Sequence, residues 1–412
     1  MTKEKSTVPR LRFPGFTDAW KQRKLGEVLK ERNESRSPSA DVPLVSFTVE
    51  NGVTPKTERY NREFLVRDEN KKYKFTQLDD IVYNPANLKF GAIARNKYGA
   101  AVFSPIYVTY GVLSEAHPLF VELIVTSTNF IQRALRYQEG TVYERMAVKS
   151  FDLLRSEILL PALPEQEAIG SFFSDLDQLI TLHQRKLDDV KELKKALLQK
   201  MFPKGNGNDF PELRFPEFKD AWKQRKLREV ATFVKGNGYS KKDLVIEGSP
   251  IILYGRLYTK YETVISEVDT FVSVEDNKNS VVYSEGGEVL VPASGESSLD
   301  IARASVVAKK GIILGGDINI IRLHSEIFPV FLALTISNGK QQKGLSKRAQ
   351  GKSVVHLHNS DLKKVDLDFP TLPEQEAIGS FFSDLDQLIT LHQRQLDHLK
   401  LLKKALLQQM FI

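Results

Sequence analysis

Three short motifs contain residue types that could hold a phosphate, a dinucleotide or a metal ion. Gly351-Lys352-Ser353 matches the end of a phosphate-binding loop, but Ser346 stands where that loop requires a glycine. Gly236-Asn237-Gly238 lacks the third glycine of a dinucleotide-binding turn. His356 and His358 alternate on an expected strand without further metal ligands, so solvent-facing or core histidines are the better interpretation. None of these motifs predicts a cofactor or a metal ion.

Two further motifs contain residue types found where DNA is methylated or cleaved. Asn84-Pro85-Ala86-Asn87 resembles the Asn-Pro-Pro-aromatic motif of amino-methyltransferases, but the second proline and the aromatic residue are missing, and no glycine-rich cofactor strand accompanies it. Glu69-Asn70-Lys71 has the last spacing of a nuclease Asp…Glu-x-Lys set, and tripeptides of this kind are common by chance. The chain has no cysteine, which excludes a thiolate nucleophile and a cysteine-ligated zinc. We therefore expect no catalytic residue in this chain.

The composition fits a soluble protein with more than one domain. The chain has 412 residues, of which 41% are hydrophobic and 27% are charged. Its formal net charge of +7 is a modest basic excess, which is compatible with a polyanionic partner. The N-terminal MTKEKSTVPR is too polar for a signal peptide, and no stretch approaches the ~18 apolar residues of a membrane-spanning helix. We therefore expect a cytoplasmic protein that does not contact a membrane.

One 40-residue segment occurs twice. Leu163–Phe202 and Leu372–Phe411 align at a shift of 209 positions and differ at only five of the 40. With Ile169 as position a of a heptad, the apolar residues collect at positions a, d and e, which predicts a long amphipathic helix. The residues expected to pack along the two helices are Ile169, Phe172, Phe173, Leu176, Leu179, Ile180, His183 and Leu187, with Ile378, Phe381, Phe382, Leu385, Leu388, Ile389, His392 and Leu396.

Each predicted helix needs a partner, because a rod of about 55 Å at ~1.5 Å per residue would bury nothing alone. The nearest partner is its own copy, so we expect two long antiparallel coiled-coil helices. His183 and His392 interrupt position a of the two helices. They are either tolerated polar core residues or residues that fix the register of the pair. Two histidines are too few ligands for a metal site.

A second, shorter repeat precedes each body of the chain. Leu11–Leu25 reads LRFPGFTDAWKQRKL and Leu213–Leu227 reads LRFPEFKDAWKQRKL, with 13 of 15 positions identical. The chain is therefore two half-molecules joined head to tail, with a pseudo-twofold internal repeat. We predict a leader and first head in residues 1–160, a first helix in 161–202, a linker in 203–212, a second leader and head in 213–370, and a second helix in 371–412.

The two heads do not repeat each other. Both consist of short stretches rich in Val, Ile and Tyr between Gly, Asn and Ser turns, together with a helix, which predicts an α+β fold. Expected strands are 42–49, 80–83 and 100–110 in the first head and 249–258, 263–274, 281–291, 304–314 and 317–323 in the second, and a helix is expected in 119–137. Two nearly identical helices that carry different heads indicate that the helices perform one task twice and that the heads perform two different tasks.

Basic and aromatic residues alternate in both heads, for example between Lys56 and Lys74. Lys and Arg neutralise phosphates, and Arg, Asn and Gln can specify bases in the major groove. Most of these residues, taken singly, are more simply explained as surface charges. As a group they predict DNA contacts by Asn84, Asn87, Lys89, Arg95, Lys97, Tyr239, Lys241, Arg256, Tyr258, Lys260, Ser294, Ser297, Arg303, Lys347, Arg348, Gln350 and Lys352.

Over essentially its whole length, the chain resembles the specificity subunit of type I DNA restriction–modification enzymes. The resemblance rests on the two leaders, on DLLRSEILLPALPEQEAI and DLKKVDLDFPTLPEQEAI, on the endings KKALLQKMF and KKALLQQMF, and on NPANLKFGAI and GNGYSKKDLVIEGSPII in the heads. It implies that each head is a target recognition domain for one half of a split double-stranded DNA sequence. It also implies that the coiled coil binds two modification (methyltransferase) subunits, and that restriction (motor-nuclease) subunits complete the complex.

The same resemblance places the chemistry on the partners. S-adenosylmethionine, ATP and magnesium are then expected on the partner subunits, and no cofactor on this chain. Two other functions remain open from the residues alone. One is an interaction scaffold with two protein-binding heads, which steep salt dependence of duplex binding would argue against. The other is a self-sufficient nuclease or methyltransferase, which the activity of the purified chain would reveal.

Overall fold

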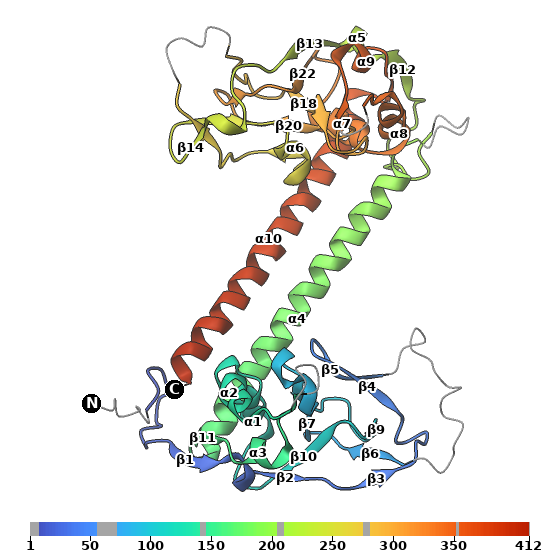
Figure 1. Cartoon of the computed structure of the whole chain (residues 1–412). Helices are drawn as coiled ribbons and strands as arrows, with labels where there is room; N and C mark the ends of the chain where they lie inside the picture. The colour runs from blue at the N-terminus through green and yellow to red at the C-terminus, as the bar shows by residue number, and fades with distance from the viewer. Residues whose placement is uncertain are drawn as a thin grey trace. The chain divides into compact units, whose positions relative to one another are not determined.

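The computed structural model describes residues 8–55, 72–140, 146–203, 210–274, 281–351 and 354–411. The chain divides into two compact units, which are residues 1–182 with 396–412 and residues 183–395. Each unit contains one head, a segment of helix α4 (Leu163–Lys200) and a segment of helix α10 (Leu372–Met410) (Figure 1). The mixture of short strands and helices in both heads agrees with the predicted α+β class.

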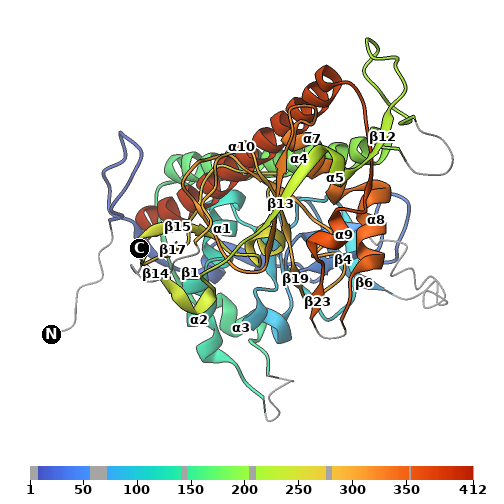
Figure 2. The ribbon, with the colours of Figure 1, turned by 90° about the horizontal axis from the view of Figure 1, so that it is seen from above.

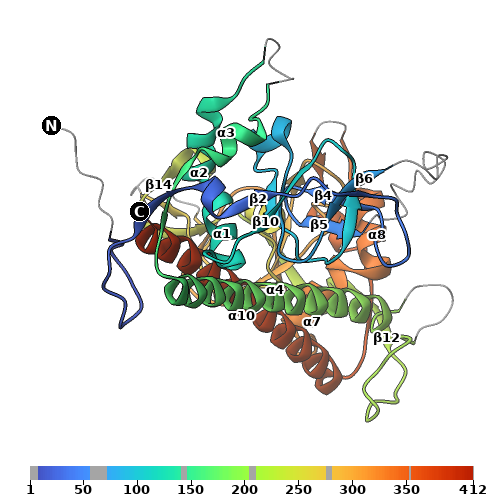
Figure 3. The same ribbon diagram turned by 90° about the horizontal axis from the view of Figure 1, so that it is seen from below.

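The described residues of the first head form four small sheets, with helices gathered at one end. Its strands are β1 (Lys21–Lys24), β2 (Leu29–Glu31), β3 (Ser35–Arg36), β4 (Val45–Thr48), β5 (Gly52–Pro55), β6 (Tyr73–Thr76), β7 (Ile81–Tyr83), β8 (Ile93–Arg95), β9 (Ala101–Phe103), β10 (Val108–Val112) and β11 (Glu157–Leu160). Its helices are α1 (Pro118–Val125), α2 (Thr128–Ala134) and α3 (Ser150–Leu154). The strand orders are β2-β10-β7-β8, β3-β6-β9, β4-β5 and β1-β11. Figure 3 shows α1, α2 and α3 on one side of this head and β4, β5 and β6 on the other.

A stacked tyrosine pair lies at the centre of the first head. β7 is buried along its whole length, and the ring of Tyr83 stacks on Tyr110 of β10 with 5.7 Å between centroids. The Tyr83 hydroxyl donates to the carbonyl of Val148 at 3.0 Å, and the Tyr110 hydroxyl donates to Ser150 Oγ at 3.0 Å. Burial raises the pKa of Tyr83, and it raises the pKa of Tyr110 to about 12. Both rings therefore stay neutral donors and attach the start of α3 to the sheet.

The second head has a larger sheet and longer helices. Its strands are β12 (Lys223–Lys226), β13 (Ala231–Lys235), β14 (Leu244–Val245), β15 (Ser249–Ile252), β16 (Val264–Ile265), β17 (Phe271–Val272), β18 (Val289–Pro292), β19 (Ser294–Gly295), β20 (Ser305–Val307), β21 (Ile313–Leu314), β22 (Ile318–Leu323), β23 (Val355–His356) and β24 (Asp366–Phe369). Its helices are α5 (Leu227–Val230), α6 (Arg256–Thr259), α7 (Pro329–Ser337), α8 (Gly339–Arg348) and α9 (Asn359–Leu362). The strand orders are β13-β22-β18-β20-β16, β14-β17-β15-β21, β12-β24 and β19-β23. Figure 2 shows α8 and α9 close to β19 and β23.

Four of the five strand predictions in the second head were wrong in extent. The range 263–274 contains only the short strands β16 and β17, and the range 281–291 contains β18 only from Val289. In the first head, the range 100–110 contains β9 and the start of β10 with 104–107 between them, and the range 119–137 is divided between α1 and α2.

The strand predicted for 249–258 ends at Ile252, because the helix α6 begins after Gly255 and places Leu257 in the core. The strand predicted for 304–314 is interrupted at Gly311, whose φ of +86° is a left-handed conformation that favours glycine. The helix α7 lies outside the stretches named from the sequence, since its eight buried residues give it no amphipathic pattern to detect.

Each unit is fastened by a leader ion pair that occurs at equivalent positions. In the first unit Arg12 donates from Nε and Nη2 to the two oxygens of Glu165, at 2.8 and 2.6 Å. In the second unit Arg214 donates to Glu374 at 2.6 and 2.7 Å. The hydrogen bonds to these carboxylates raise the pKa of both arginines. The two leaders therefore hold the first turn of each long helix in the same way, since a bidentate pair also fixes orientation.

An aromatic cluster completes the repeated frame of each unit. In the first unit Phe411 of the α10 end contacts Trp20, Phe120 and Phe173 at centroid distances of 6.0, 5.5 and 6.4 Å. In the second unit the equivalent residue at the α4 end, Phe202, contacts Trp222, Phe331 and Phe382 at 6.4, 5.9 and 6.3 Å. The leader tryptophan, the head, the start of one long helix and the end of the other thus share one core in each unit.

The two helix segments within each unit run antiparallel. In the first unit Lys403 Nζ lies 2.6 Å from Asp177, while Phe411 contacts Phe173, so numbers rise along one segment as they fall along the other. In the second unit Lys194 pairs with Asp386. Both ion pairs occupy equivalent positions of the repeat.

The contact face between these segments differs from the one assigned from the heptad. Positions a and e are buried at Ile169, Phe173, Leu176 and Leu187 and at Ile378, Phe382, Leu385 and Leu396, and Ile180, His183, Phe381, Ile389 and His392 are half-buried. Phe172, Leu179 and Leu388 of position d are 36%, 40% and 38% exposed. Their assignment to helix packing was wrong. Residues at positions a and e follow each other at alternating spacings of four and three residues, so these two positions alone form a continuous contact face.

His183 and His392 face each other in the second unit. Their ring centroids are 5.8 Å apart, and both Nδ1 atoms are buried without a hydrogen-bond partner among the described residues. The pair therefore forms a polar layer in an otherwise apolar helix contact. The described residues contain no group of three or more His, Cys, Asp or Glu side chains that could hold a metal ion.

Candidate nucleic-acid interface

In the first head, a short 3₁₀ helix at Pro85–Phe90 carries two of the predicted DNA-contacting residues, Asn87 and Lys89, and a third, Asn84, caps it. Asn84 is 6% exposed and caps this helix by accepting a hydrogen bond from the backbone of Ala86 at 3.1 Å. Leu88 is fully buried and anchors the segment, while Asn87 is exposed. Asn84 thus has a structural role, and the segment presents Asn87 to solvent.

The aromatic residue of this segment was missed in the sequence. Phe90 is 64% exposed, and the ammonium group of Lys89 lies 4.9 Å from its ring centroid. An exposed ring beside a cation and an amide is a surface on which a base can stack. The sequence signal that could have found Phe90 is its place directly before a glycine. Gly91 ends the helix with a φ of +83°, and residues at such a helix end are often exposed.

Arg95 and Lys97 are held by carboxylates of the first head. Arg95 is 11% exposed, and it donates to Asp79 at 2.5 Å and to Glu122 at 2.8 Å. Lys97 Nζ lies 2.7 Å from the other oxygen of Glu122 and remains 58% exposed. Arg95 therefore stabilises the fold, while Lys97 can exchange its partner for a phosphate at little cost.

We expect opposite results from substitutions at Arg95 and Asn87. Arg95→Ala leaves the carboxylates of Asp79 and Glu122 short of a partner, which should cost about 2 kcal/mol of unfolding free energy. Asn87→Ala should change stability by less than about 0.5 kcal/mol and lower duplex affinity or base discrimination by about 1–3 kcal/mol. Denaturant unfolding and fluorescence anisotropy with a target duplex measure the two effects. Loss of affinity in Arg95→Ala at unchanged stability would show that Arg95 contacts DNA itself.

In the second head, Arg256 and Lys260 share the carboxylate of Asp269. Arg256 is 8% exposed and pairs with Glu262 and Asp269, both at 2.6 Å, and Lys260 reaches Asp269 at 2.8 Å. The hydrogen bond from Lys260 lowers the pKa of Asp269. The pKa of Asp269 is therefore lower in the folded state than in the unfolded state. The ion pairs of Asp269 stabilise the fold above the usual pKa range of an aspartate, and this stabilisation is lost as pH falls through the lowered pKa.

A second cluster joins β19 and β23. Ser294 Oγ lies 3.0 Å from Nδ1 of His356, and the rings of His356 and His358 are stacked at 6.4 Å. The backbone of Gln350 pairs with that of His356. Both histidines are exposed, so they offer hydrogen-bonding edges beside Ser294. The alternation noted in the sequence thus belongs to a surface cluster, although His358 lies at the start of α9.

The segment after β19 contains two of the residues that affect the pKa of Tyr258 of α6. Ser297 Oγ donates to Asp300 at 2.6 Å. Burial raises the pKa of Tyr258, and the negative charges of Glu296 and Asp300 act in the same direction. Tyr258 therefore lies close enough to the turn that contains Ser297 for these two carboxylates to act on it.

The remaining predicted contacts are dispersed. Tyr239 is 2% exposed and belongs to a core cluster, so it cannot present its ring to DNA in this conformation. Its prediction as a DNA-contacting residue was therefore wrong. Lys241 and Lys347 are exposed, Arg303 lies 5.3 Å from the ring of Tyr261, and Arg348 donates to the carbonyl of Asp361 at 3.0 Å. Lys352 lies outside the described residues, as do residues 56–71 of the basic stretch that runs from Lys56 to Lys74.

Comparison with known proteins identifies similar chains. Residues 219–401 match the family model described as type I restriction modification DNA specificity domain. The type I restriction enzyme MjaVIII specificity subunit of Methanocaldococcus jannaschii is 22% identical over 280 residues, which are 65% of this chain and 64% of that protein. The match thus spans just under two thirds of that relative's length.

A solved structure supports the fold. The S subunit of a type I restriction–modification system from M. genitalium matches with a TM-score of 0.63 at 14% identity, and it covers 98% of this chain and 99% of that chain. The resemblance to specificity subunits that the repeated motifs indicated is therefore confirmed. No described helix is both long enough and apolar enough to span a membrane.

Proposed function

We propose that this chain, as a member of the type I specificity-subunit family, binds double-stranded DNA and reads a target in two parts. Each head would recognise one half of the target. The observation that carries the proposal is that two different heads are mounted on the same frame, with the same leader ion pair and aromatic cluster in each unit. A scaffold that gripped one partner twice would have no need of different heads.

The long helices would form an antiparallel coiled coil that relates the two heads by a pseudo-twofold axis. Two DNA half-sites read by such a pair would be separated by a fixed number of base pairs, because groove positions repeat about every 34 Å. The antiparallel contacts within each unit support this arrangement. The target should then be split by bases that the protein does not read.

Recruitment of two modification subunits is supported by an exposed stripe on both helices. We call it the leucine stripe. In the first unit it consists of Leu179 and Leu182 on α4 and Leu402 on α10, and in the second unit of the equivalent Leu388 and Leu391 on α10 and Leu193 on α4. These side chains are between 38% and 51% exposed. Repeated apolar positions on one helix face are typical of a surface that packs against another helix. Because the stripe occurs twice, it fits two copies of one partner.

The chemistry would belong to the partners. S-adenosylmethionine would bind to the modification subunits, and ATP and magnesium to the partner subunits, including the restriction subunits of the full complex. This chain would position the partner subunits on the DNA without catalysing a reaction, and it would not contact a membrane. The purified chain incubated with S-adenosylmethionine or with magnesium should neither methylate nor cleave DNA, and either activity would favour a self-sufficient enzyme.

Salt dependence of duplex binding tests the proposal against a protein-binding scaffold. The logarithm of the binding constant should fall linearly with the logarithm of salt concentration, with a slope of about −0.9 for each phosphate neutralised. The measurement is made on the complete chain in complex with its modification subunits, with single-stranded DNA as a control. Absence of duplex binding at low salt would contradict the proposal.

A further inference from the structure

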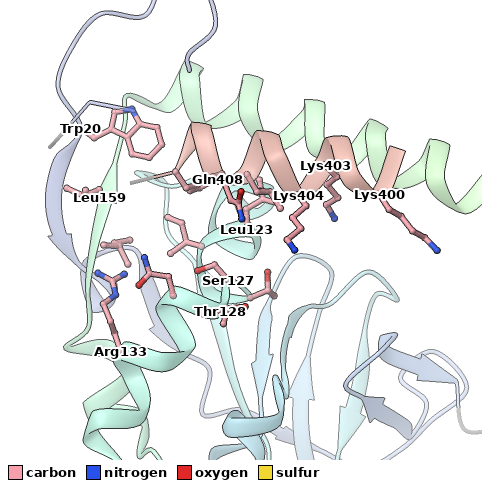
Figure 4. A pocket seen from close by; sticks show the side chains of 16 residues that line it. Trp20, Leu123, Ser127, Thr128, Arg133, Leu159, Lys400, Lys403, Lys404 and Gln408 are labelled. Carbon is pink, nitrogen blue, oxygen red and sulfur yellow. The ribbon is translucent and has the colours of Figure 1, made fainter. Parts of the chain in front are cut away.

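Each unit contains an open groove where the end of one long helix meets a helix pair of the head. In the first unit the groove has a volume of about 770 Å³ and lies between α10 and α1–α2. Figure 4 shows Lys400, Lys403 and Lys404 of α10 on one side, with Ser127, Thr128 and Arg133 on the other. In the second unit a groove of about 630 Å³ lies between α4 and the start of α8, where Asn338 joins α7 to α8.

The helix sides of the two grooves are identical in sequence. In the first unit they consist of Lys400, Lys403, Lys404, Leu407, Gln408 and Phe411, and the second groove uses the same six residue types 209 positions earlier. All five differences between the long repeats fall between Lys186 and Lys200, within the same part of the helix, and none lines a groove. The same surface is therefore presented once by each unit.

The lining of both grooves is basic, and no carboxylate is among the described residues that line them. In the first unit, Lys403 is neutralised by Asp177, but Lys400, Lys404 and Arg133 have no acidic partner among the described residues, and Nε of Arg133 is buried without a hydrogen bond. In the second unit, Lys194 pairs with Asp386 and Lys340 pairs with Asp368. Three cations of that groove have no acidic partner in the described part of the chain, namely Lys191, Lys195 and Lys343. Each groove therefore offers three uncompensated positive charges.

The floor of the grooves is apolar. In the first groove it includes Trp20, Leu123 and Phe411, and in the second it includes Leu198 and Phe202. A DNA backbone would satisfy the cations but would present phosphates and sugars to these rings. A protein segment that carries carboxylates beside large apolar side chains would satisfy both parts, since apolar burial and charge pairing then occur together.

We propose that each groove docks an acidic, amphipathic segment of a modification subunit, one copy for each unit. This inference rests on the proposed function, and it adds a second contact to the one assigned to the leucine stripe. Lys191 and Lys195 are each two residues from Leu193, which places them about 160° away around a helix of 3.6 residues per turn. The groove and the stripe thus lie on different faces and can be altered separately.

Charge reversal in one groove at a time tests the proposal. Lys404→Glu changes the first groove and Lys195→Glu the second, and both residues are exposed. The matched control is Arg185→Glu with Arg394→Glu, which reverses two exposed charges on the same helices outside both grooves. Each complete chain is purified with the modification subunit of its system, and native mass spectrometry counts the bound copies while titration calorimetry gives their affinities.

We expect two copies on the unaltered chain and on the control. Each single variant should bind one copy of the modification subunit with unchanged affinity and the other copy at least about tenfold more weakly. The double variant, Lys195→Glu with Lys404→Glu, should bind both copies more weakly. If tryptophan fluorescence shows that a variant does not fold, Lys191→Glu and Lys400→Glu, which are also exposed, replace it.

Three results would overturn the inference. If the double variant binds two copies as tightly as the control, recruitment stands and the grooves do not take part in it. If the double variant keeps both subunits but loses duplex affinity, the grooves contact phosphates instead. If the unaltered chain binds no modification subunit, the proposed recruitment fails as well as the groove.

Discussion

Phe382→Ala should lower the stability of the second unit by about 3–5 kcal/mol, the usual cost of removing a fully buried phenylalanine. Phe382 is fully buried, and its ring contacts Phe202 at 6.3 Å within the cluster that joins the two helix segments to the head. Truncation leaves a cavity beside Phe202, which itself contacts Trp222. The loss should therefore weaken the leader, the head and the helix contact together.

The two tryptophans of the chain allow this loss to be measured in one unit at a time. Trp20 lies in the first unit and Trp222 in the second, and both are buried. In a Trp20→Phe background, Phe382→Ala should lower the urea midpoint read from Trp222 by about 1–2 M. Leu391→Ala, 51% exposed on the same helix, is the matched control and should shift it little. Equal shifts in the two variants would refute the central role of the cluster.

Glu374→Ala should cost about 3 kcal/mol, because it leaves a guanidinium group without its carboxylate in a largely buried place. Glu374 is 1% exposed and Arg214 is 14% exposed. The carbonyl of Asp220 would remain as a partner of Arg214 at 2.5 Å, which places the cost at the lower end of the range for buried pairs. The readout is again the unfolding midpoint from Trp222.

Two comparisons separate the pair from general effects of charge. Glu376→Ala removes an exposed carboxylate two residues further along α10 and should change stability by less than about 0.5 kcal/mol. Removing both charges, in Arg214→Met with Glu374→Leu, should cost less than Glu374→Ala alone, since no buried charge is left unpaired. A double variant as unstable as Glu374→Ala would mean that lost packing, and not the unpaired arginine, causes the effect.

The repeated frame could be predicted from the sequence because it is encoded twice. The segment Leu163–Phe202 predicted α4, which ends two residues earlier at Lys200. The sequence predicted the extent of the helix better than it predicted which face of the helix is buried. Leu179 and Leu176 are the same residue type one helical turn apart, yet only Leu176 is buried. Hydrophobicity alone does not distinguish a face that packs within the unit from one that is left exposed.

The candidate DNA contacts were harder to predict, because the partners of charged residues are distant in sequence. Arg95 forms an ion pair with Glu122, and Arg256 forms one with Asp269. No spacing of neighbouring residues in the sequence predicts either ion pair. The opposite error occurred at Phe90, an exposed ring that looks like a core residue in the sequence. Base readers must be free and accessible, and these two properties are set by tertiary contacts.

The most direct test of the central claim is methylome sequencing of cells that express this chain with its modification subunit, against cells in which this chain is deleted. The account predicts a new methylated motif in two short parts separated by a gap of unspecified bases. A contiguous motif would mean that only one head reads DNA. No new motif, with the modification subunit shown to be present and active, would contradict the assignment of this chain as a DNA-reading subunit.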